Sequence, residues 1–399
     1  MATEQFVIFD VNENRYQNDF SVSQESGIEL SGSAAWSVSK HTLRGGLSAG
    51  VDVVEINNGA LALSLLPTRG MGIWRGEYRG ISLGWDSPVQ RPVNPSFVNL
   101  HERSGLGWLN GFQEFLCRCG LASNGPPGTD VVLDNNGNEI QTDLTLHGKI
   151  ANTPAWRTEV EISDVDSGLL SVTGYIDESM MFGPSLRLKS TLQTAAGSSS
   201  FTIIDEVTNL GGQTTELQLL YHTNIGQPLL DEGTRFVAPI RELAPRDSRA
   251  QEGIDSFPAY SAPVTGFVEQ VYFMTLLEDA TGRSVVLLKN STADKGLSLE
   301  FQPQQLPYFS LWKNTQSMRD GYVTGLEPAT NFPNLKTFER ERGRVVTLEP
   351  SESAAFEITI TVLDSIKSVA DVENRIAKIQ SQVAPTVHSQ PIARFTPVS

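Results

Sequence analysis

Cysteine and positive charge are both scarce in this sequence. The two cysteines, Cys117 and Cys119, are separated by a single residue, which would strain a bridge between them. A disulfide-stapled scaffold is therefore excluded, and we expect a cytoplasmic protein. Lys and Arg total 30 against 46 Asp and Glu, which gives a net charge of −16. Nonspecific nucleic-acid binding depends on clustered cations, so we expect no nucleic-acid partner.

Long apolar runs and cofactor fingerprints are also missing. No window holds about 20 uninterrupted apolar residues, so we expect no membrane-spanning helix. The opening residues Met-Ala-Thr-Glu-Gln-Phe-Val lack the basic segment and the following apolar segment of a secretory leader. Neither a Gly-x-Gly-x-x-Gly motif nor a Gly-x-x-x-x-Gly-Lys-Ser/Thr motif occurs, so no nucleotide cofactor is expected. A Cys-x-Cys segment supplies only half of a zinc site, and we expect no bound metal.

Apolar residues recur with a period of two over most of the chain, which is typical of strands with one buried face. The segment from Trp156 to Ile162 shows this alternation clearly. Further strands, at a spacing of about ten residues, are expected at 169–176, 186–192, 201–207 and 217–222. Hairpins are expected where turn residues join two apolar runs, at 51–56 with 60–66 and at 267–277 with 284–288. The pattern predicts an all-β fold, a large antiparallel β-sandwich with few short helices.

One segment near the end of the chain has helical spacing. Within 368–380, apolar residues recur at i, i+3, i+7 and i+10, and Ser368 with Asp371 resembles a capping box. No Pro/Ser/Gly-rich linker divides the chain, so we expect one domain over 1–385 that includes this helix, followed by an extended tail over 386–399. The helix and the tail can pack on their own sandwich or on a second copy of the chain, and the latter would make a homo-oligomer.

The chain has only five histidines, and two of them stand in informative places. His147 precedes a glycine, and His222 ends a predicted strand, where functional groups often lie. Imidazole ionises near neutral pH, so both are candidates for acid and base roles. Pro328 and Pro333 stiffen the segment that carries Glu327, so this carboxylate is held in place. Each of these three residues can instead be an ordinary structural or surface residue.

The segments around these three residues resemble the active-site motifs of the aldose 1-epimerases, or galactose mutarotases. Leu146-His147-Gly148, Tyr221-His222-Thr223-Asn224 and Leu326-Glu327-Pro328 follow that family's order of His, His and Glu. From about residue 45 to 360 the chain resembles more specifically the DUF4432 family, a branch of the mutarotase-like proteins. The motifs that carry this second resemblance are Leu66-Pro67-Thr68-Arg69-Gly70-Met71-Gly72, Gly84-Trp85, Gly107-Trp108-Leu109-Asn110-Gly111-Phe112 and Arg118-Cys119-Gly120-Leu121.

The resemblance implies a mutarotase-like supersandwich that binds a small-molecule sugar in a cleft on one sheet, without a cofactor. It implies that Glu327 takes the proton of the anomeric hydroxyl while His222 protonates the ring oxygen, so that the ring opens and recloses on its other face. His147 is implied as a further contact to the sugar. A Glu⁻/His⁺ pair can keep both groups charged near neutral pH. The substrate contacts expected beside this trio are Arg69, Arg118, Glu114, Asn224 and Trp312.

Two departures from the family pattern leave the substrate open. The family continues its second histidine motif with Pro-Tyr-Phe-Asn, whereas His222 is followed by Thr223-Asn224. The family's arginine motif has no clean counterpart, and Arg69 and Arg118 are the two candidates for its role. The alternatives are a sugar-binding or sensing protein without turnover, and an isomerase or lyase that acts on an uncommon sugar in the same cleft. A metal site made of two histidines and one carboxylate is a further alternative reading of the trio.

Overall fold

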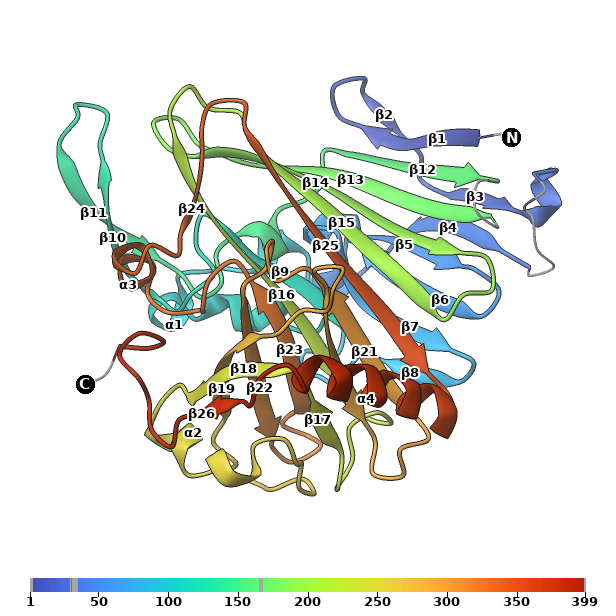
Figure 1. Ribbon diagram of the computed structural model, residues 1–399. Coiled ribbons are helices and arrows are strands. Elements are labelled where there is room, and N and C mark those ends of the chain that lie inside the picture. Colours follow the sequence, from blue (N-terminus) through green and yellow to red (C-terminus); the bar gives the residue numbers. More distant parts are fainter. Residues whose placement is uncertain (1–2, 29, 31–34, 165–167, 398–399) are drawn as a thin grey trace.

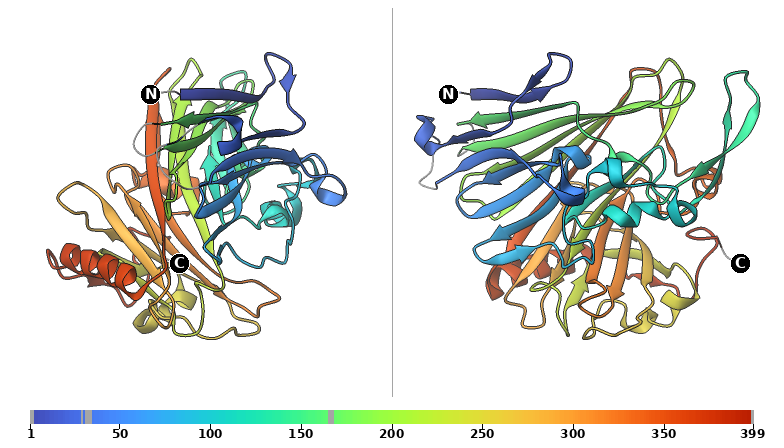
Figure 2. Two further views of the ribbon diagram at one scale, coloured as in Figure 1. Left: turned by 90° about the vertical axis from the view of Figure 1, so that its right-hand side faces the viewer. Right: turned by 180° about the vertical axis from the view of Figure 1, so that it is seen from behind.

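The computed structural model describes residues 3–28, 30, 35–164 and 168–397. Two large sheets of mainly antiparallel strands are stacked face to face, and a small two-stranded hairpin projects from one end (Figures 1 and 2). The prediction of an all-β sandwich with few short helices is therefore confirmed.

The ten-stranded sheet contains the N-terminal strands and the longest hairpins. Its strands, in spatial order, are β17 (Arg235–Val237), β20 (Ser284–Lys289), β21 (Gly296–Phe301), β25 (Ser353–Leu363), β15 (Ser200–Asn209), β14 (Ser185–Ala195), β13 (Leu169–Ser179), β12 (Arg157–Ser163), β1 (Thr3–Asp10) and β2 (Arg15–Tyr16). The four strands predicted from residue 169 to residue 222 are all present. Three of them, β13 to β15, lie side by side in this sheet.

The fourteen-stranded sheet carries the site described below. Its strands, in spatial order, are β26 (Thr386–Val387), β18 (Ile240–Pro245), β19 (Gln270–Leu276), β22 (Tyr308–Thr315), β23 (Tyr322–Ala329), β16 (Thr215–Ile225), β9 (Leu116–Leu121), β7 (Gly72–Tyr78), β6 (Leu61–Leu66), β5 (Asp52–Asn57), β4 (Ser37–Thr42) and β3 (Phe20–Ser23), with β24 (Val346–Leu348) beside β16 and β8 (Ile81–Leu83) beside β7. The projecting hairpin consists of β10 (Gly128–Leu133) and β11 (Glu139–Leu144).

The alternation of side chains places the main core between the two large sheets. Leu188 and Leu192 of β14 are buried in this core, and Leu219 and Tyr221 of β16 meet them from the other sheet. Successive side chains of a strand point to opposite faces, so His222 lies on the outer face of the fourteen-stranded sheet. The outer face of this sheet is where the candidate site is built.

One of the two predicted hairpins is confirmed and the other is wrong. Strands β5 and β6 pair as expected, and the Asn58 side chain accepts hydrogen bonds from the Ala60 and Leu61 amides in the turn. Strands β19 and β20, in contrast, belong to different sheets. A turn does form between them, since the Asp279 amide donates to the Arg283 carbonyl at 2.8 Å. Both strands are apolar on both faces, so the periodicity cannot show which sheet each one joins.

The predicted C-terminal helix is confirmed as α4 (Ile366–Gln380). It begins two residues earlier than expected, because the capping box is formed by Ser365 and Ser368, and the expected box of Ser368 with Asp371 is wrong. Ser365 Oγ accepts from the Ser368 amide, and Ser368 Oγ accepts from the Ser365 amide. Three buried apolar residues of this helix, Val369, Ile376 and Ile379, pack against residues of the ten-stranded sheet.

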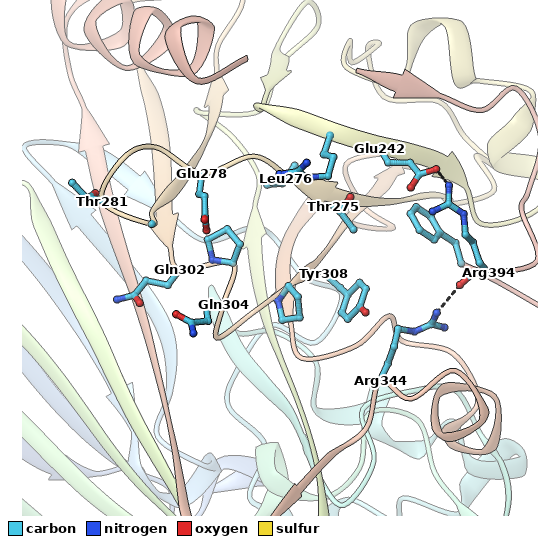
Figure 3. A pocket seen from close by; sticks show the side chains of 15 residues that line it. Glu242, Thr275, Leu276, Glu278, Thr281, Gln302, Gln304, Tyr308, Arg344 and Arg394 are labelled. Carbon is cyan, nitrogen blue, oxygen red and sulfur yellow. Dashed lines mark hydrogen bonds and ion pairs between the residues drawn. The ribbon is translucent and has the colours of Figure 1, made fainter. Parts of the chain in front are cut away.

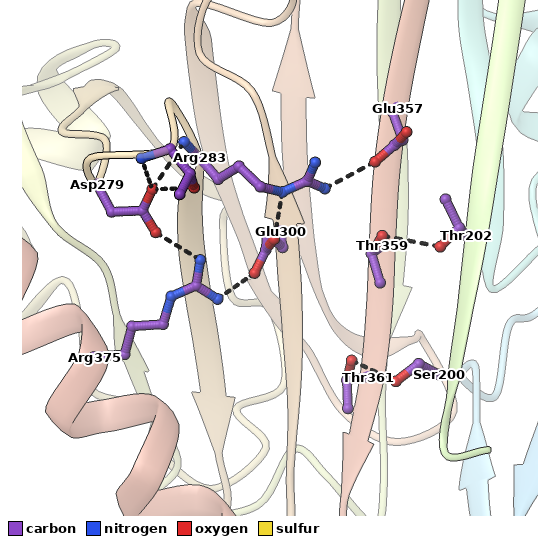
Figure 4. A network of polar contacts seen from close by, with 10 residues as sticks. Ser200, Thr202, Asp279, Arg283, Glu300, Glu357, Thr359, Thr361 and Arg375 are labelled. Carbon is purple, nitrogen blue, oxygen red and sulfur yellow. Dashed lines mark hydrogen bonds and ion pairs between the residues drawn. The ribbon is translucent and has the colours of Figure 1, made fainter. Parts of the chain in front are cut away.

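A network of ion pairs fixes α4 on the outer face of the ten-stranded sheet (Figure 4). Arg375 donates to Asp279 at 2.8 Å and also pairs with Glu300 of β21. Arg283 also pairs with Glu300, and it donates to Glu357 of β25 at 2.9 Å. Two arginines and three carboxylates thus join the helix, the loop after β19 and two strands. The helix is therefore a fixed part of the sandwich.

The C-terminal tail lies along the edge of the fourteen-stranded sheet. Strand β26 pairs in parallel with β18, and His388 Nε2 lies 2.6 Å from Glu242 Oε1. Further on, the Phe395 ring packs on Phe332 with 4.8 Å between ring centres. The tail also closes one side of a hollow of about 910 Å³ (Figure 3). In this hollow Arg344 donates to the Arg394 carbonyl, and the Arg394 side chain pairs with Glu242.

The remaining helices are short. The α-helices are α1 (Glu102–Gly105), α2 (Ser248–Gln251) and α3 (Lys336–Glu341). The 3-10 helices are η1 (Gln24–Ser26), η2 (Gly46–Ser48), η3 (Pro67–Arg69), η4 (Pro95–Phe97), η5 (Gly107–Gly111), η6 (Ile150–Asn152) and η7 (Ile254–Ser256). Within the described ranges, no helix combines the length and the apolar character that crossing a membrane requires.

Candidate active site

His222 and Glu327 come from neighbouring strands and lie side by side on the outer face of the fourteen-stranded sheet. Thr223 of β16 is paired with Leu326 of β23, so the residues next to them, His222 and Glu327, are cross-strand neighbours as well. His222 Nε2 lies 3.2 Å from Glu327 Oε1. Only 5% of the His222 surface and 3% of the Glu327 surface are exposed. The structure therefore brings together two of the three residues that the sequence motifs single out as catalytic.

Gly325 makes room for this pair. It precedes Glu327 by two residues on the same face of β23, and it is paired with Trp312 of β22. A side-chain carbon at position 325 would lie 2.4 Å from Glu327 Oε1 and 3.2 Å from both His222 Cε1 and Trp312 Cε3. A glycine at this position thus lets three functional side chains converge over one point of the sheet.

Several buried polar atoms around the pair have no hydrogen-bond partner among the described residues. His222 Nδ1 is one of them. Glu327 Oε1 is another, because its 3.2 Å contact with His222 Nε2 lacks hydrogen-bond alignment. Asn224 Oδ1 and Ser310 Oγ are two more. Asn224 follows His222 by two residues, and Ser310 is paired directly with Glu327. Buried polar groups without partners are costly, so this cluster has the chemistry of a site for a polar ligand.

Burial drives both ionisable groups of the pair toward their neutral forms. Desolvation lowers the pKa of His222 from its usual 6.5 to about 3, and the neighbouring His147 contributes to the decrease. Desolvation raises the pKa of Glu327 well above its ordinary value, and Glu269 adds to the increase. The expectation of a charged Glu⁻/His⁺ pair is therefore wrong for this buried arrangement. Between the two pKa values the pair holds a single proton, and burial places it on Glu327.

His147 reaches the pair from the loop after β11. Its ring centre lies 5.7 Å from that of His222 and 4.8 Å from that of Trp108. His147 Nδ1 lies 2.8 Å from the backbone oxygen of Asn124. A carbonyl can only accept, so Nδ1 carries the proton and Nε2 is left as an acceptor. Desolvation lowers the pKa of His147, against the effect of this hydrogen bond, and the ring is neutral at pH 7.

The backbone around His147 is unusual. Both His147, at φ 58°, and Gly148, at φ 70°, adopt the left-handed conformation. A side-chain carbon at Gly148 would lie 2.3 Å from the Ser123 oxygen and 2.4 Å from the Gly120 oxygen. The sequence suggested that this glycine lets a ligand approach the backbone. Instead, it is the segment from β9 that approaches, and the close contact sets the direction of the histidine.

Asn124 also joins the His147 loop to the strand that carries Glu327. Asn124 Nδ2 donates to Asn331 Oδ1 at 3.2 Å, and Asn331 Nδ2 donates to Asn124 Oδ1 at 3.0 Å. Both residues are fully buried. Asn331 follows Glu327 by four residues, in the segment with the two prolines. The reciprocal amide pair therefore fixes the loop that carries His147 relative to the strand that carries Glu327.

Aromatic rings surround the trio. Phe112 lies 5.1 Å from His222 between ring centres, Trp312 lies 5.3 Å away and Trp108 lies 6.2 Å away. Trp312, expected as a substrate contact, is thus beside the pair. Trp108 and Phe112 belong to a motif that identified the family branch but had not been assigned to the site. These rings exclude water and offer apolar faces to a ligand.

An arginine that the sequence analysis missed lies at the rim of this site. Trp312 Nε1 donates to Glu269 Oε2 at 2.7 Å, and Arg246 Nη2 donates to Glu269 Oε1 at 2.9 Å. Both charged residues affect the pKa of Glu327, because Glu269 raises it and Arg246 lowers it. Neither residue belongs to a recognisable motif. Their position follows only from the pairing of β18, β19 and β22, which the sequence does not show.

A family model described as "Domain of unknown function (DUF4432)" matches residues 48–362, which include the whole trio. The chain belongs to the DUF4432 family. The resemblance drawn from the sequence motifs is thereby confirmed. A search of curated proteins found no match.

Solved structures place this DUF4432 member among the mutarotase-like folds. A Klebsiella pneumoniae protein described as a "putative aldose 1-epimerase" is 36% identical, with 98% of this chain and 99% of that chain covered and a TM-score of 0.91. A galactose mutarotase-like protein from Clostridium acetobutylicum is 14% identical, covering 79% of this chain and 96% of that one, with a TM-score of 0.52. A galactose mutarotase related enzyme from Lactobacillus acidophilus is 10% identical, covering 78% and 98%, with a TM-score of 0.53. The last two show the fold alone.

In this DUF4432 member, Arg69 and Glu114 form a buried ion pair with each other. Arg69 Nε donates to Glu114 Oε1 at 2.6 Å. The two terminal nitrogens of Arg69 donate to the Val93 and Gly111 carbonyls and to Asn152 Oδ1, each at 2.9 Å. The guanidinium is thus committed to neighbouring loops. The structure places this pair behind the Phe112 segment, where it supports the wall of the site.

Arg118 lies on the opposite face of the sheet from His222. Its guanidinium makes two contacts with Asp205 of β15, one of them at 2.9 Å, and donates to Ser190 of β14 at 2.7 Å. Tyr221 also donates to Asp205, at 2.8 Å. Arg118 is 1% exposed and bridges the two sheets through the core. The structure therefore does not bring this arginine to the catalytic pair.

Asn224 is the remaining expected contact, and it does lie on the face of the pair. Its Nδ2 donates to the Glu114 carbonyl at 2.9 Å. Its Oδ1 has no partner among the described residues. Among those same residues, no group of three or more His, Cys, Asp or Glu side chains is arranged to hold a metal ion.

Proposed function

We propose that this protein is an aldose 1-epimerase-like isomerase that opens and recloses the ring of a sugar by proton transfer at His222 and Glu327. The observation that supports this most is the 3.2 Å approach of a buried imidazole to a buried carboxyl, with polar atoms around them that lack partners among the described residues. Ring opening needs one group to take the anomeric proton and one to protonate the ring oxygen. Both oxygens are bonded to one carbon, so the two groups must be close together.

The single proton of the pair suits this reaction. In the opening step Glu327 takes the proton of the anomeric hydroxyl, the bond between the anomeric carbon and the ring oxygen breaks, and His222 gives its proton to the ring oxygen. Closure on the other face reverses both transfers, so each group donates once and accepts once. Without a ligand, burial raises the pKa of Glu327 and so favours the proton on this carboxyl. A sugar hydroxyl that accepts from His222 Nδ1 would stabilise the imidazolium and move the proton to His222 before the ring opens.

The neighbours of the pair are suited to hold the sugar. The free Nε2 of His147 accepts from a hydroxyl, and Asn224 Oδ1 and Ser310 Oγ provide further polar contacts. Trp312 and Phe112 offer apolar faces to the C–H groups of the ring. Glu269 orients Trp312 through its indole nitrogen. Positioning of this kind is what converts a weak acid and a weak base into an efficient pair.

The proposal is tested by following anomer exchange of neutral hexoses and deoxysugars by two-dimensional NMR exchange spectroscopy. We expect the wild-type protein to accelerate exchange of at least one sugar above the spontaneous rate, and Glu327→Gln to lower this acceleration by about 10²–10⁴. Glu341→Gln, at an exposed glutamate of α3, is the matched control and should keep wild-type activity. A wild-type protein that binds a sugar but leaves its exchange rate unchanged would contradict the proposal.

A further inference from the structure

A second hollow opens on the outer face of the fourteen-stranded sheet, beside the candidate active site. Its volume is about 580 Å³, and an adjoining hollow of about 300 Å³ shares the Trp74, Trp85 and Gln113 side chains. Small-molecule sites commonly measure roughly 300–1,000 Å³. Strands β5 to β8 form the floor, and the segments around Trp85 and Gln113 form one wall. None of the trio lines either hollow, so this space is separate from the proton-transfer site.

Gln113 is the feature that points to a ligand. It is only 3% exposed, it lines both hollows, and neither Nε2 nor Oε1 of its amide has a partner among the described residues. A buried amide without partners costs free energy, which a ligand with hydroxyl groups would offset. The larger hollow of Figure 3 differs in this respect, because its charged residues Glu242, Arg344 and Arg394 are engaged with protein groups.

Two indole rings in the hollow are held in place. Trp85 Nε1 donates to the Glu114 carbonyl at 3.2 Å. Two glycines pack against the same residue, since a side-chain carbon at Gly226 would lie 2.9 Å from Trp85 Cβ and one at Gly321 would lie 2.7 Å from the ring atom Cζ3. Trp74 is half-buried, and the Arg75 guanidinium lies 4.2 Å from its ring centre. Fixed indoles beside a free amide provide both stacking faces and hydrogen bonds, which is the chemistry that a sugar ring requires.

The charges around the hollow exclude an anionic ligand. Glu55, Glu77 and Asp86 line it against the single cation Arg75, which gives a local charge of 1 − 3 = −2. Ser64 donates to both oxygens of Glu55, at 2.8 and 3.0 Å, and so holds this carboxylate over the floor. Acidic sugars and sugar phosphates would be repelled. A neutral saccharide, whose hydroxyls can donate to the carboxylates, fits this lining.

We propose that this hollow binds a second, neutral sugar ring of the substrate. Phe112 connects the two places, because its ring centre lies 5.1 Å from that of Trp85 and 5.1 Å from that of His222. Asn224, on the face of the catalytic pair, donates to the carbonyl of the residue after Gln113. The substrate is then a reducing disaccharide or a longer neutral saccharide with its reducing ring at His222 and Glu327. The placement of the reacting ring rests on the proposed function, whereas sugar binding in the hollow does not.

The test measures binding in the Glu327→Gln protein, in which turnover is removed. Lactose, maltose and cellobiose are titrated by calorimetry against galactose and glucose. We expect at least one disaccharide to bind about tenfold more tightly than its monosaccharides. Adding Gln113→Leu should remove this advantage and leave monosaccharide affinity unchanged. Gln304→Leu, the same change in the hollow of Figure 3, is the control and should alter neither affinity.

The outcomes separate this inference from the proposed function. Equal affinity for disaccharides and monosaccharides, or a disaccharide advantage that survives Gln113→Leu, would overturn the second-ring site. Tight, Gln113-dependent disaccharide binding without anomer exchange in the wild-type protein would keep this site and reject the isomerase. Trp74→Ala provides a second variant if Gln113→Leu does not fold, since Trp74 is only half-buried. Trp74→Ala should also remove the disaccharide advantage, and unchanged affinities would overturn the inference.

Discussion

Arg118 of β9 and Asp205 of β15 join the two sheets of the sandwich through an ion pair in which both side chains are almost completely buried. The Gly70 and Met71 carbonyls accept from the same guanidinium, and Tyr221 donates to the same carboxylate. Such a pair stabilises the fold only while it is complete, because loss of one partner leaves the other charge desolvated and uncompensated.

We therefore predict that Arg118→Met lowers the free energy of unfolding by about 3–5 kcal/mol, as is typical for loss of one partner of a buried ion pair. Urea denaturation followed by tryptophan fluorescence measures this change. Arg118→Met combined with Asp205→Asn should recover much of the loss, since no buried charge is then left without a partner. Sugar affinity of the folded fraction should stay unchanged. A stable Arg118→Met protein with weakened sugar binding would instead show that this arginine contacts substrate.

The open space at Gly325 gives a prediction about activity. Gly325→Ala places a methyl carbon 2.4 Å from Glu327 Oε1, which is too close, so the flexible carboxyl must move aside. A displacement of about 1 Å in a catalytic group can cost about 10²-fold in rate. We expect a loss of anomer exchange of that size.

The free energy of unfolding should not fall together with the activity, because alanine suits an extended strand at least as well as glycine. Thermal unfolding of Gly325→Ala should thus match the wild type within a few degrees. Gly212→Ala is the matched control, since a side-chain carbon there meets nothing within 4 Å. Full activity in Gly325→Ala would mean that the position of the Glu327 carboxyl does not matter.

The lowered pKa of His222 predicts a dependence of stability on pH. The folded protein binds this proton more weakly than the unfolded chain does. The contribution to stability is therefore fully present above pH 6.5, and it is lost as the pH falls toward about 3. Between pH 7 and pH 4 we expect the wild type to lose up to about 3 kcal/mol more than His222→Asn. Urea titrations at both pH values measure this difference, and parallel losses in the two proteins would contradict the burial of a neutral imidazole.

The sequence predicted those parts of the fold and the site that depend on local pattern. The period of two located β13 to β16, and motif order singled out His147, His222 and Glu327 although they are far apart in the chain. The face on which Arg118 lies could not be predicted, because it depends on the register between β9 and β16. The separation of β19 from β20 was hidden by strands that are apolar on both faces. The pKa directions of His222 and Glu327 depend on burial, which no motif encodes.

The central claim is that Glu327 and His222 act as one unit on a single sugar ring. The most direct measurement is the rate of anomer exchange in Glu327→Gln, in His222→Asn and in the double variant, with the spontaneous rate subtracted and sugar binding measured alongside. We predict that each single change lowers the rate by about 10²–10⁴ with sugar binding largely kept, and that the double variant is far less impaired than the product of the two. Multiplicative losses in the double variant, or wild-type exchange in Glu327→Gln, would contradict the claim.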